Sequence, residues 1–448
     1  MKLAACIVAL ALTHIAFASE TLLDAAERND LAAVKSLLEK GAKPDEANSY
    51  HVTPLSLACL NGNAEMTALL LKAGASVTPP DAEPILFTAT RTGNAACIQA
   101  LLAAGADPNA KGSSDQTPLM WAAALGHSAG VKPLLAAKAD PTTTLDSGFD
   151  AFFFAVRAGH RDIVKQLLAA GIDVNGVRSP SKQNPKSIRS NTSALLLAVE
   201  NGHLELALEL VAAGADPNDL RSGLSPLHSI VRVRRTVRGD GADGIPPPRG
   251  SGSVVSLDFT RKIIAAGAKI NLQLTEGKGG AGNLSEKGAT PFLFACQTGD
   301  MDLMKLLLEL GADPKIPNAD NCTPLLAATG MEVPAPGEEP ASEDDSIAAA
   351  KLLLELGADI NHADKNGETV MHCAAYKSAP KLIRFLDANG ADISRWNKKN
   401  KHGWTPLLIA QGFRPGNFRP IQYTIDAMSE VMRKHGIDPS PSHPPPGK

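Results

Sequence analysis

The chain has 448 residues, a formal net charge of −3 at neutral pH and only 4% aromatic residues. This near-neutral balance gives no reason to expect nucleic acid or a membrane surface as the partner. Glycine and proline are frequent, with 38 and 32 copies, which favours short helices separated by turns over a β-sandwich.

The first 18 residues have the pattern of a secretory signal peptide. Lys2 precedes an apolar run that ends at Ala16-Phe17-Ala18, directly before Ser19. Small residues around an apolar run of this length predict cleavage between Ala18 and Ser19. The run is too short to predict a membrane span, and no other segment has the roughly 20 apolar residues that a span needs. We therefore expect an exported protein, either periplasmic or secreted.

Two short phrases recur along the rest of the sequence. The first is Thr-Pro-Leu, which begins at Thr53, Thr117, Thr323 and Thr405 and has near-copies between these positions. The second is Gly-Ala-Asp-Pro-Asn or a variant, which closes each unit, as at Gly214. The base period is 33 residues, and eleven units fill residues 20–437. A fixed period of this size predicts a repeat protein.

The repeat resembles that of the ankyrin-repeat family, whose signature phrase is Thr-Pro-Leu-His. Ser225-Pro226-Leu227-His228 and the segment 369–374 come closest to it. The resemblance implies an all-α solenoid of helix-turn-helix units with β-hairpin fingers over residues 19–437. It also implies that partner proteins bind the concave face, through the finger tips and the exposed end of each first helix.

The residue pattern of each unit agrees with this fold. Threonine can cap a helix, and proline at the first helical position loses no hydrogen bond. Glycines such as Gly93 and Gly126 are expected to end the first helix, because glycine adopts left-handed dihedral angles most easily. A single helix pair cannot bury its apolar face, so stability must come from contacts between neighbouring repeats.

Insertions interrupt the period at two kinds of place. Finger insertions lie near 176–191 and 272–288, with a shorter one at 394–403, and inter-helix insertions lie near 234–256, 331–345 and 413–419. The 234–256 loop is basic and the 331–345 loop is acidic. The two loops could meet each other, meet a shared partner, or remain solvated separately. Ser342 and Asp345 resemble a capping box, and residues 438–448 read as a disordered, proline-rich tail.

No motif for catalysis is found. His127, His160 and His203 each follow an inter-helix glycine, where other repeats place Asn63 or Asp300. A position that accepts histidine, asparagine or aspartate is typical of a turn and helix cap. The sequence contains no catalytic triad, no metal-binding motif and no phosphate-binding loop. We expect no enzyme activity, no cofactor and no metal.

Several cysteine and aromatic residues are assigned by comparing repeats. Cys59 and Cys296 occupy a slot that other repeats fill with small residues, which predicts burial. Cys322 precedes Thr323 in a finger and is expected to be exposed. Trp121 occupies the slot of Leu57 and is expected in the core.

Candidate partner-binding residues follow from the concave-face slot. The end of the first helix carries an arginine in three repeats: Arg91, Arg157 and Arg232. Finger-tip candidates are Lys111, Ser113, Trp396, Lys398, Lys399 and Lys401. Trp404 belongs to the same candidate finger, 395–404, with the alternative that its ring only seals the next repeat. Aromatic residues beside arginine or lysine are common anchors at interfaces.

The sequence thus predicts an exported, non-enzymatic scaffold that binds a partner protein. Two alternatives share this fold: a secreted, host-directed effector that imitates eukaryotic ankyrin scaffolds, or a periplasmic protective or inhibitor protein for a neighbouring enzyme. Repeat proteins of one architecture bind unrelated targets, so the sequence does not name the partner.

Overall fold

A computed structural model describes residues 20–80, 82–182, 187–235, 248, 250–277, 284–331, 341–414 and 419–439. The predicted signal peptide lies outside these residues, as do most of the proline-rich tail and the middle parts of several insertions. The chain divides into two compact units. The first unit contains residues 1–173 and 180–188, and the second contains residues 174–179 and 189–448.

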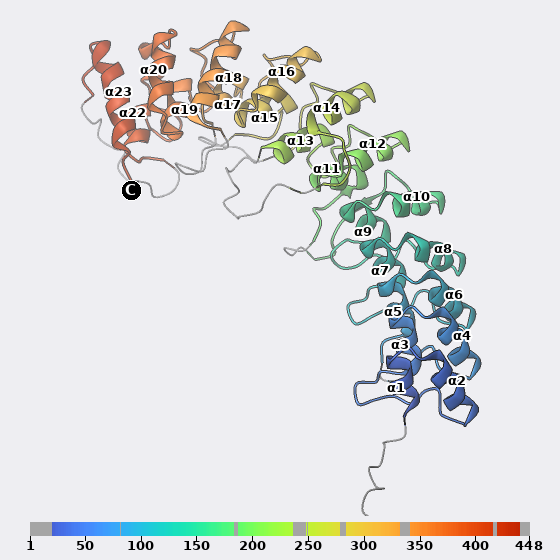
Figure 1. Ribbon diagram of the computed structural model, residues 1–448. Helices are drawn as coiled ribbons and strands as arrows, with labels where there is room; N and C mark the ends of the chain where they lie inside the picture. The colour runs from blue at the N-terminus through green and yellow to red at the C-terminus, as the bar shows by residue number, and fades with distance from the viewer. Residues whose placement is uncertain are drawn as a thin grey trace, which may run out of the picture. The chain divides into compact units, whose positions relative to one another are not determined.

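Helix pairs make up the first unit (Figure 1). Its described helices are α1 (Leu22–Glu27), α2 (Leu31–Glu39), α3 (Pro54–Leu60), α4 (Ala64–Lys72), α5 (Ile85–Thr92), α6 (Ala95–Ala103), α7 (Pro118–Leu125), α8 (Ser128–Ala136), α9 (Ala151–Ala158) and α10 (Arg161–Ala169). First helices pack on first helices and second helices on second helices. Each pair therefore buries its apolar face against its neighbours.

The second unit repeats this arrangement. Its described helices are α11 (Ala194–Glu200), α12 (Leu204–Ala212), α13 (Pro226–Arg234), α14 (Ser256–Ala265), α15 (Pro291–Gln297), α16 (Met301–Glu309), α17 (Pro324–Ala328), α18 (Glu343–Glu355), α19 (Val370–Tyr376), α20 (Pro380–Ala388), α21 (Ile393–Trp396), α22 (Pro406–Ala410) and α23 (Gln422–Lys434). The short helix α21 lies in a finger. Across the residues that the structure describes, the other helices form eleven pairs.

The first helices begin as the recurring phrase predicts. The hydroxyl of Thr117 accepts a hydrogen bond from the Met120 amide, and Pro118 occupies the first helical position. Ser342 and Asp345 form the predicted capping box of α18. These bonds satisfy amides that have no partner inside the helix.

The inter-helix histidines lie in turns, as predicted, but their side chains do not cap the following helix. His127 Nε2 donates to the Arg91 carbonyl of the preceding repeat at 3.0 Å, and its ring lies against Gly93. His160 makes the same kind of bond to the Ala124 carbonyl at 3.2 Å. The turn histidines of the first unit therefore connect neighbouring repeats.

Two other histidines are fully buried in the second unit. His228 Nε2 donates to the Ala289 carbonyl at 3.1 Å, and its Nδ1 accepts from the Ser225 hydroxyl at 2.7 Å. His372 makes equivalent bonds with the Lys398 carbonyl and the Thr369 hydroxyl. Burial lowers the pKa of His228 to about 3 and that of His372 to about 4, because a buried imidazolium loses its hydration. Both rings are therefore neutral.

The fingers are loops closed by a recurring backbone bond. The amide of Gly112 donates to the Gln116 carbonyl at 2.9 Å, and Leu145 donates to Phe149 at 2.8 Å. Among the described residues, a strand pair forms only between β1 (Val177–Arg178) and β2 (Thr192–Ser193), which is antiparallel. The predicted β-hairpin is thus reduced to a tight turn in most of the described fingers.

An asparagine at the end of each Gly-Ala-Asp-x-Asn phrase joins consecutive repeats. Asn109 Oδ1 accepts from the Asp140 amide at 2.7 Å, and its Nδ2 donates to the Lys138 carbonyl at 3.2 Å. In the second unit, Asn218 makes the same two bonds to Lys269 and Gly267. The recurrence of asparagine therefore reflects a contact between repeats.

The five cysteines of the described chain are free and buried. Burial of Cys59 and Cys296 agrees with the sequence prediction. The expectation that Cys322 is exposed is wrong, because its side chain is only 1% exposed. The Cys322 amide donates to Asn318 Oδ1 at 2.8 Å, and this closed finger turns the thiol into the core.

Candidate partner-binding surface

The exposed end of the first helix forms a row of side chains in each unit. We call this position, seven residues after the capping residue, the first-helix row. In the first unit, Leu60 is 58% exposed, and Arg91 and Arg157 are also exposed. In the second unit, Gln297 and Tyr376 of the row are only 7% and 2% exposed. The row is therefore open in the first unit and covered at these positions of the second.

Two arginines of this row in the first unit, Arg91 and Arg157, lie over aromatic rings. The guanidinium of Arg91 is 5.0 Å from the centre of the Trp121 ring, and that of Arg157 is 5.2 Å from the centre of Phe149. Such contacts hold a cation in place while leaving part of it accessible. Arg91 also pairs with Glu83. Trp121 is only half-buried, which corrects its assignment to the core.

Two neighbouring fingers of the first unit and the helix α9 border an open hollow of about 610 Å³. We call it the finger groove. It is lined by Lys111, Ser114, Asp115, Gln116, Thr144, Leu145, Asp146, Ser147, Phe149, Phe154 and Arg157. The rings of Phe149 and Phe154 stack with centres 5.0 Å apart. The groove thus combines an aromatic surface, a cation and polar edges.

Backbone turns hold the two fingers beside this groove. Asp115 and Gly148 both have positive φ angles, of 57° and 88°. These angles let the chain reverse its direction two residues before the helix-capping residues Thr117 and Asp150. Asp146 is also held, because its carboxylate accepts from the Ser181 hydroxyl at 2.7 Å. A surface fixed in this way loses little conformational entropy when it binds.

The structure brings together some of the predicted residues of the first unit. Lys111 and Arg157 line the same groove, and Ser113 is exposed at the tip of the same finger without lining it. Phe149 and Phe154 were not named as candidates from the sequence. The three-residue spacing of Phe154 and Arg157 on one helix was the available signal, because such residues lie on the same helix face.

Arg232 differs from the other two arginines. It belongs to the second unit, lies 5.1 Å from the centre of the Phe294 ring and pairs with Glu286. Its side chain is 32% exposed. Its neighbours in the row are the half-buried Glu200 and the buried Gln297, so Arg232 is less open to a partner than Arg91 and Arg157.

The finger at 395–404 is only partly available to a partner. Trp396 is 1% exposed, and its indole N–H donates to the Ala391 carbonyl at 3.3 Å. Its assignment as a partner anchor is therefore wrong, because α21 turns the ring into the core. Lys398, Lys399 and Lys401 are exposed. Trp404 is half-buried and packs against the core of the second unit.

The described residues contain no group of histidine, cysteine or acidic side chains that could hold a metal ion. Among them, no helix is both long enough and apolar enough to cross a membrane. Stacked helix pairs with fingers on one face define a repeat scaffold.

Comparison with family models identifies this scaffold. The model "Ankyrin repeats (3 copies)" matches residues 22–112 and 86–178, and "Ankyrin repeats (many copies)" matches residues 341–386. The model "Ankyrin repeat" matches residues 190–221 and 287–319. Together these segments span more than half of the sequence, and the chain belongs to the ankyrin-repeat family. The repeats of this family are typically non-catalytic binding domains.

Individual relatives match only parts of the chain. "Ankyrin repeat, SAM and basic leucine zipper domain-containing protein 1" of Eulemur macaco macaco is 34% identical over 111 residues, which cover 23% of each protein. "Probable 26S proteasome regulatory subunit p28" of Saccharomyces cerevisiae is 29% identical over 127 residues, covering 28% of this chain and 49% of p28. The chain thus spans about a quarter to a half of these curated relatives. The solved human ASB11 ankyrin repeat domain is 23% identical, with a TM-score of 0.41, covering 55% of this chain and 96% of that one.

Proposed function

We propose that this protein is an exported, non-catalytic scaffold that binds a partner protein on the finger face of its first unit. We define the finger face as the open first-helix row together with the finger groove. The observation that carries the proposal is the difference in exposure between the two rows. Arg91 and Arg157 are exposed beside the half-buried Trp121 and the buried Phe149, respectively, whereas Gln297 and Tyr376 are buried.

The chemistry of the finger face supports protein binding. Aromatic and arginine side chains contribute most of the energy in many protein interfaces. Here they are already ordered by stacking, by the closed fingers and by bonds between repeats. A partner segment could place an apolar side chain against the partly exposed Phe154 and a carboxylate beside Arg157.

Exchange of two arginines for glutamate tests this surface. We expect Arg91→Glu with Arg157→Glu to abolish capture of the partner from native extract, because the change removes both stacked cations. The double variant should unfold at a temperature close to that of the wild type, since both side chains are exposed. Affinity capture followed by mass spectrometry, with thermal unfolding by circular dichroism, measures both effects.

A matched control makes the same change of charge elsewhere. Lys35→Glu with Lys132→Glu alters two exposed lysines on the second helices α2 and α8. This variant should retain the proteins that the wild type captures. Equal capture by both double variants would show that the partner does not use the finger face.

Export is tested separately, by cell fractionation and mass spectrometry of the mature N-terminus. The proposal rests on the sequence of residues 1–18 and expects a chain that begins at Ser19 outside the cytoplasm. Recovery of a chain that still begins at Met1 in the cytoplasmic fraction would contradict export, and would leave the finger-face proposal standing.

A further inference from the structure

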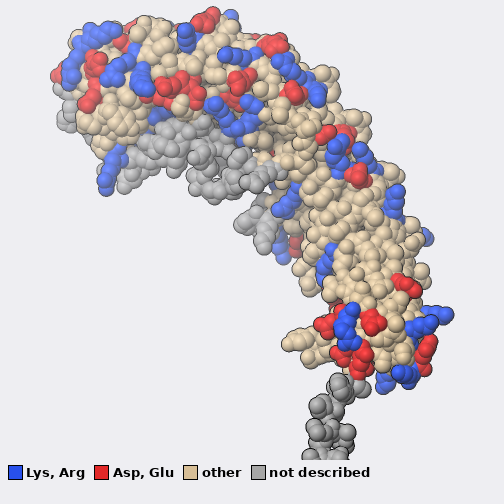
Figure 2. Space-filling view, in the orientation of Figure 1, with Lys and Arg blue, Asp and Glu red and all other residues tan. Residues whose placement is uncertain are grey.

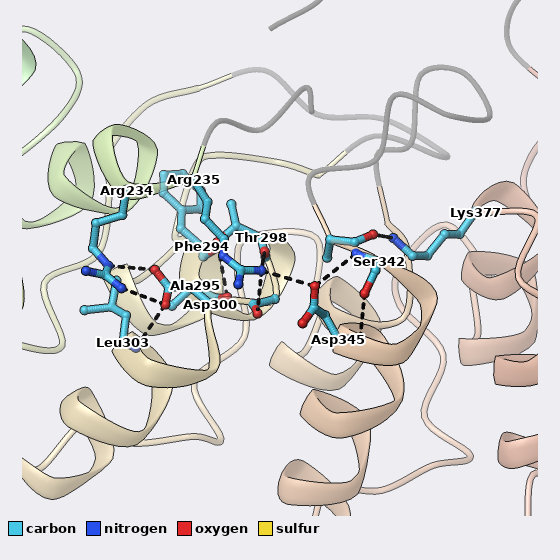
Figure 3. A network of polar contacts seen from close by, with 12 residues as sticks. Arg234, Arg235, Phe294, Ala295, Thr298, Asp300, Leu303, Ser342, Asp345 and Lys377 are labelled. Atoms are coloured by element: carbon cyan, nitrogen blue, oxygen red, sulfur yellow. Dashed lines mark hydrogen bonds and ion pairs between the residues drawn. The ribbon is translucent and has the colours of Figure 1, made fainter. Parts of the chain in front are cut away.

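The first two inter-helix insertions of the second unit meet at their described ends (Figure 3). Arg234 closes α13, before the first insertion, and makes a two-bond ion pair with Asp300. The distances are 2.7 Å from Nε to Oδ2 and 3.0 Å from Nη2 to Oδ1. Asp300 also caps α16, by accepting from the Leu303 amide at 3.1 Å. This pair joins two neighbouring repeats.

The next residue, Arg235, reaches further. Its Nη1 donates to the carbonyls of Thr298 and Gly299 at 3.4 and 3.1 Å, where α15 ends. The same nitrogen lies 3.3 Å from Oδ2 of Asp345, in the first turn of α18. A cation at the carboxyl end of a helix is favourable because the unpaired carbonyls carry partial negative charge.

This second contact skips a repeat. Arg235 directly follows α13, the first helix of the pair α13/α14. Thr298 belongs to the next pair, α15/α16, and Asp345 to the pair after that, α17/α18. In a solenoid each repeat normally contacts only its nearest neighbours, so that stability is nearly a sum of local terms. A side chain that joins a repeat to its second neighbour adds coupling that this sum lacks.

The two ion pairs differ in burial. The side chains of Arg234 and Asp300 are 16% and 3% exposed, whereas those of Arg235 and Asp345 are 38% and 35% exposed. Burial alone would raise the pKa of Asp345. The Ser342 hydroxyl and amide and the Arg235 guanidinium outweigh it and hold the pKa below its usual value. Asp345 is thus charged, and salt can reach and screen its pair with Arg235.

We propose that Arg234, Arg235, Asp300 and Asp345 form an edge clasp, which couples the opening of three successive helix pairs, α13 to α18. The shielded Arg234–Asp300 pair is its permanent part. The accessible Arg235–Asp345 pair is its salt-sensitive part. A further bond links this edge to α19. Lys377, the residue after α19, donates from its Nζ to the carbonyl of Ala341 at 2.6 Å, at the described end of the second insertion.

Hydrogen exchange of the full chain, read by mass spectrometry, tests the clasp. We expect Arg235→Gln to speed amide exchange in α18 by about threefold, the effect of losing one partly exposed ion pair. The described helices of the first unit should be unchanged. If exchange increases only at the end of α15, the coupling to the second neighbour is absent and the clasp is wrong.

A control pair of similar charge joins adjacent repeats only. Arg261 of α14 binds Glu309 of α16 through two bonds of 2.8 and 3.0 Å. Arg261→Gln should leave exchange in α18 unchanged. An equal increase in α18 for both variants would mean that any lost ion pair loosens this segment, which would overturn the proposal.

The dependence of hydrogen exchange on salt concentration is a second, independent test of the clasp. Raising the ionic strength from about 0.05 M to 1 M shortens the screening length to about 3 Å. Exchange in α18 should accelerate in the wild type and much less in Arg235→Gln, whose outer pair is already lost. Circular dichroism checks that both variants fold, and the same salt response in the two proteins would contradict the assignment.

Discussion

Lowering the pH from 7 to 4.5 is expected to destabilise the second unit by about 2–3 kcal/mol for each of two buried histidines. His228 and His372 are neutral and fully buried, with pKa values lowered by burial to about 3 and about 4. In the unfolded chain each imidazole has a pKa near 6.5. Below that pH the unfolded chain therefore binds protons that the folded chain cannot accept.

The sign follows from this difference in proton uptake. The stability contributed by the neutral rings is fully present above about pH 6.5 and is lost as the pH falls toward the folded pKa values. The loss is more than about 1 kcal/mol per pH unit for each ring. Carboxylates with lowered pKa values, such as Asp345 and Asp387, lose stability only in more acidic solution. In the window from pH 6.5 to 4.5 the loss of stability therefore comes from the histidines, because burial raises the pKa of Asp364 in the second unit and this carboxyl adds stability as the pH falls.

Urea unfolding at several pH values, followed by circular dichroism, measures this effect. The double variant His228→Gln, His372→Gln should show a much flatter dependence of unfolding free energy on pH, and each single variant about half the change. His127→Gln is the control, because His127 lies in the first unit. A double variant as sensitive to pH as the wild type would show that other groups cause the acid instability.

Adding one methyl group at Gly93 is expected to destabilise the first unit by about 3 kcal/mol. Gly93 has a φ of +73°, and a Cβ there would lie 2.3 Å from His127 Nδ1. The left-handed backbone costs an alanine about 1–2 kcal/mol, and the overpacked contact adds about 1–3 kcal/mol. The displaced ring would also lose its bond to the Arg91 carbonyl.

Gly105→Ala separates these two costs. Gly105 has a φ of +90°, but a Cβ there meets nothing within 4 Å, so only the backbone cost should appear. Urea unfolding of Gly93→Ala, Gly105→Ala and the double variant Gly93→Ala, His127→Ala gives the comparison. The steric explanation is wrong if the two single variants are equally destabilised.

Much of the fold follows from local chemistry that is visible in the sequence. Thr117 caps its helix and Pro118 starts it, as the recurring phrase predicts. Ser342 and Asp345 form their capping box. Such features depend on residues three or four positions apart, so a sequence pattern can show them directly.

Contacts between repeats were harder to predict. The sequence shows that His127 occupies a turn, but not that its ring bonds to a carbonyl 36 residues earlier. Trp396 lies among exposed lysines in the sequence, yet one short helix turns it inward. Cys322 is buried for a similar reason, because Asn318 closes its finger. In each case the direction of the side chain is set by a turn that composition does not specify.

The candidate surface, too, was predictable from the sequence only in its local features and not in its contacts between repeats. The arginine positions could be read from the repeat register, and the opposite charges of two insertions suggested a meeting. The aromatic rings beneath Arg91 and Arg157 belong to other elements of the fold. Which arginine reaches Asp345 also depends on where α13 ends, and a helix end is uncertain by a residue or two.

The placement of the buried thiols gives each unit its own chemical reporter. Cys59 and Cys97 lie in the first unit, and Cys296, Cys322 and Cys373 lie in the second. Burial raises the pKa of the three thiols of the second unit, and only an opened segment exposes a thiolate to an alkylating reagent. Pulsed alkylation with peptide mapping therefore times the opening of the two units independently, in one sample and without an added label.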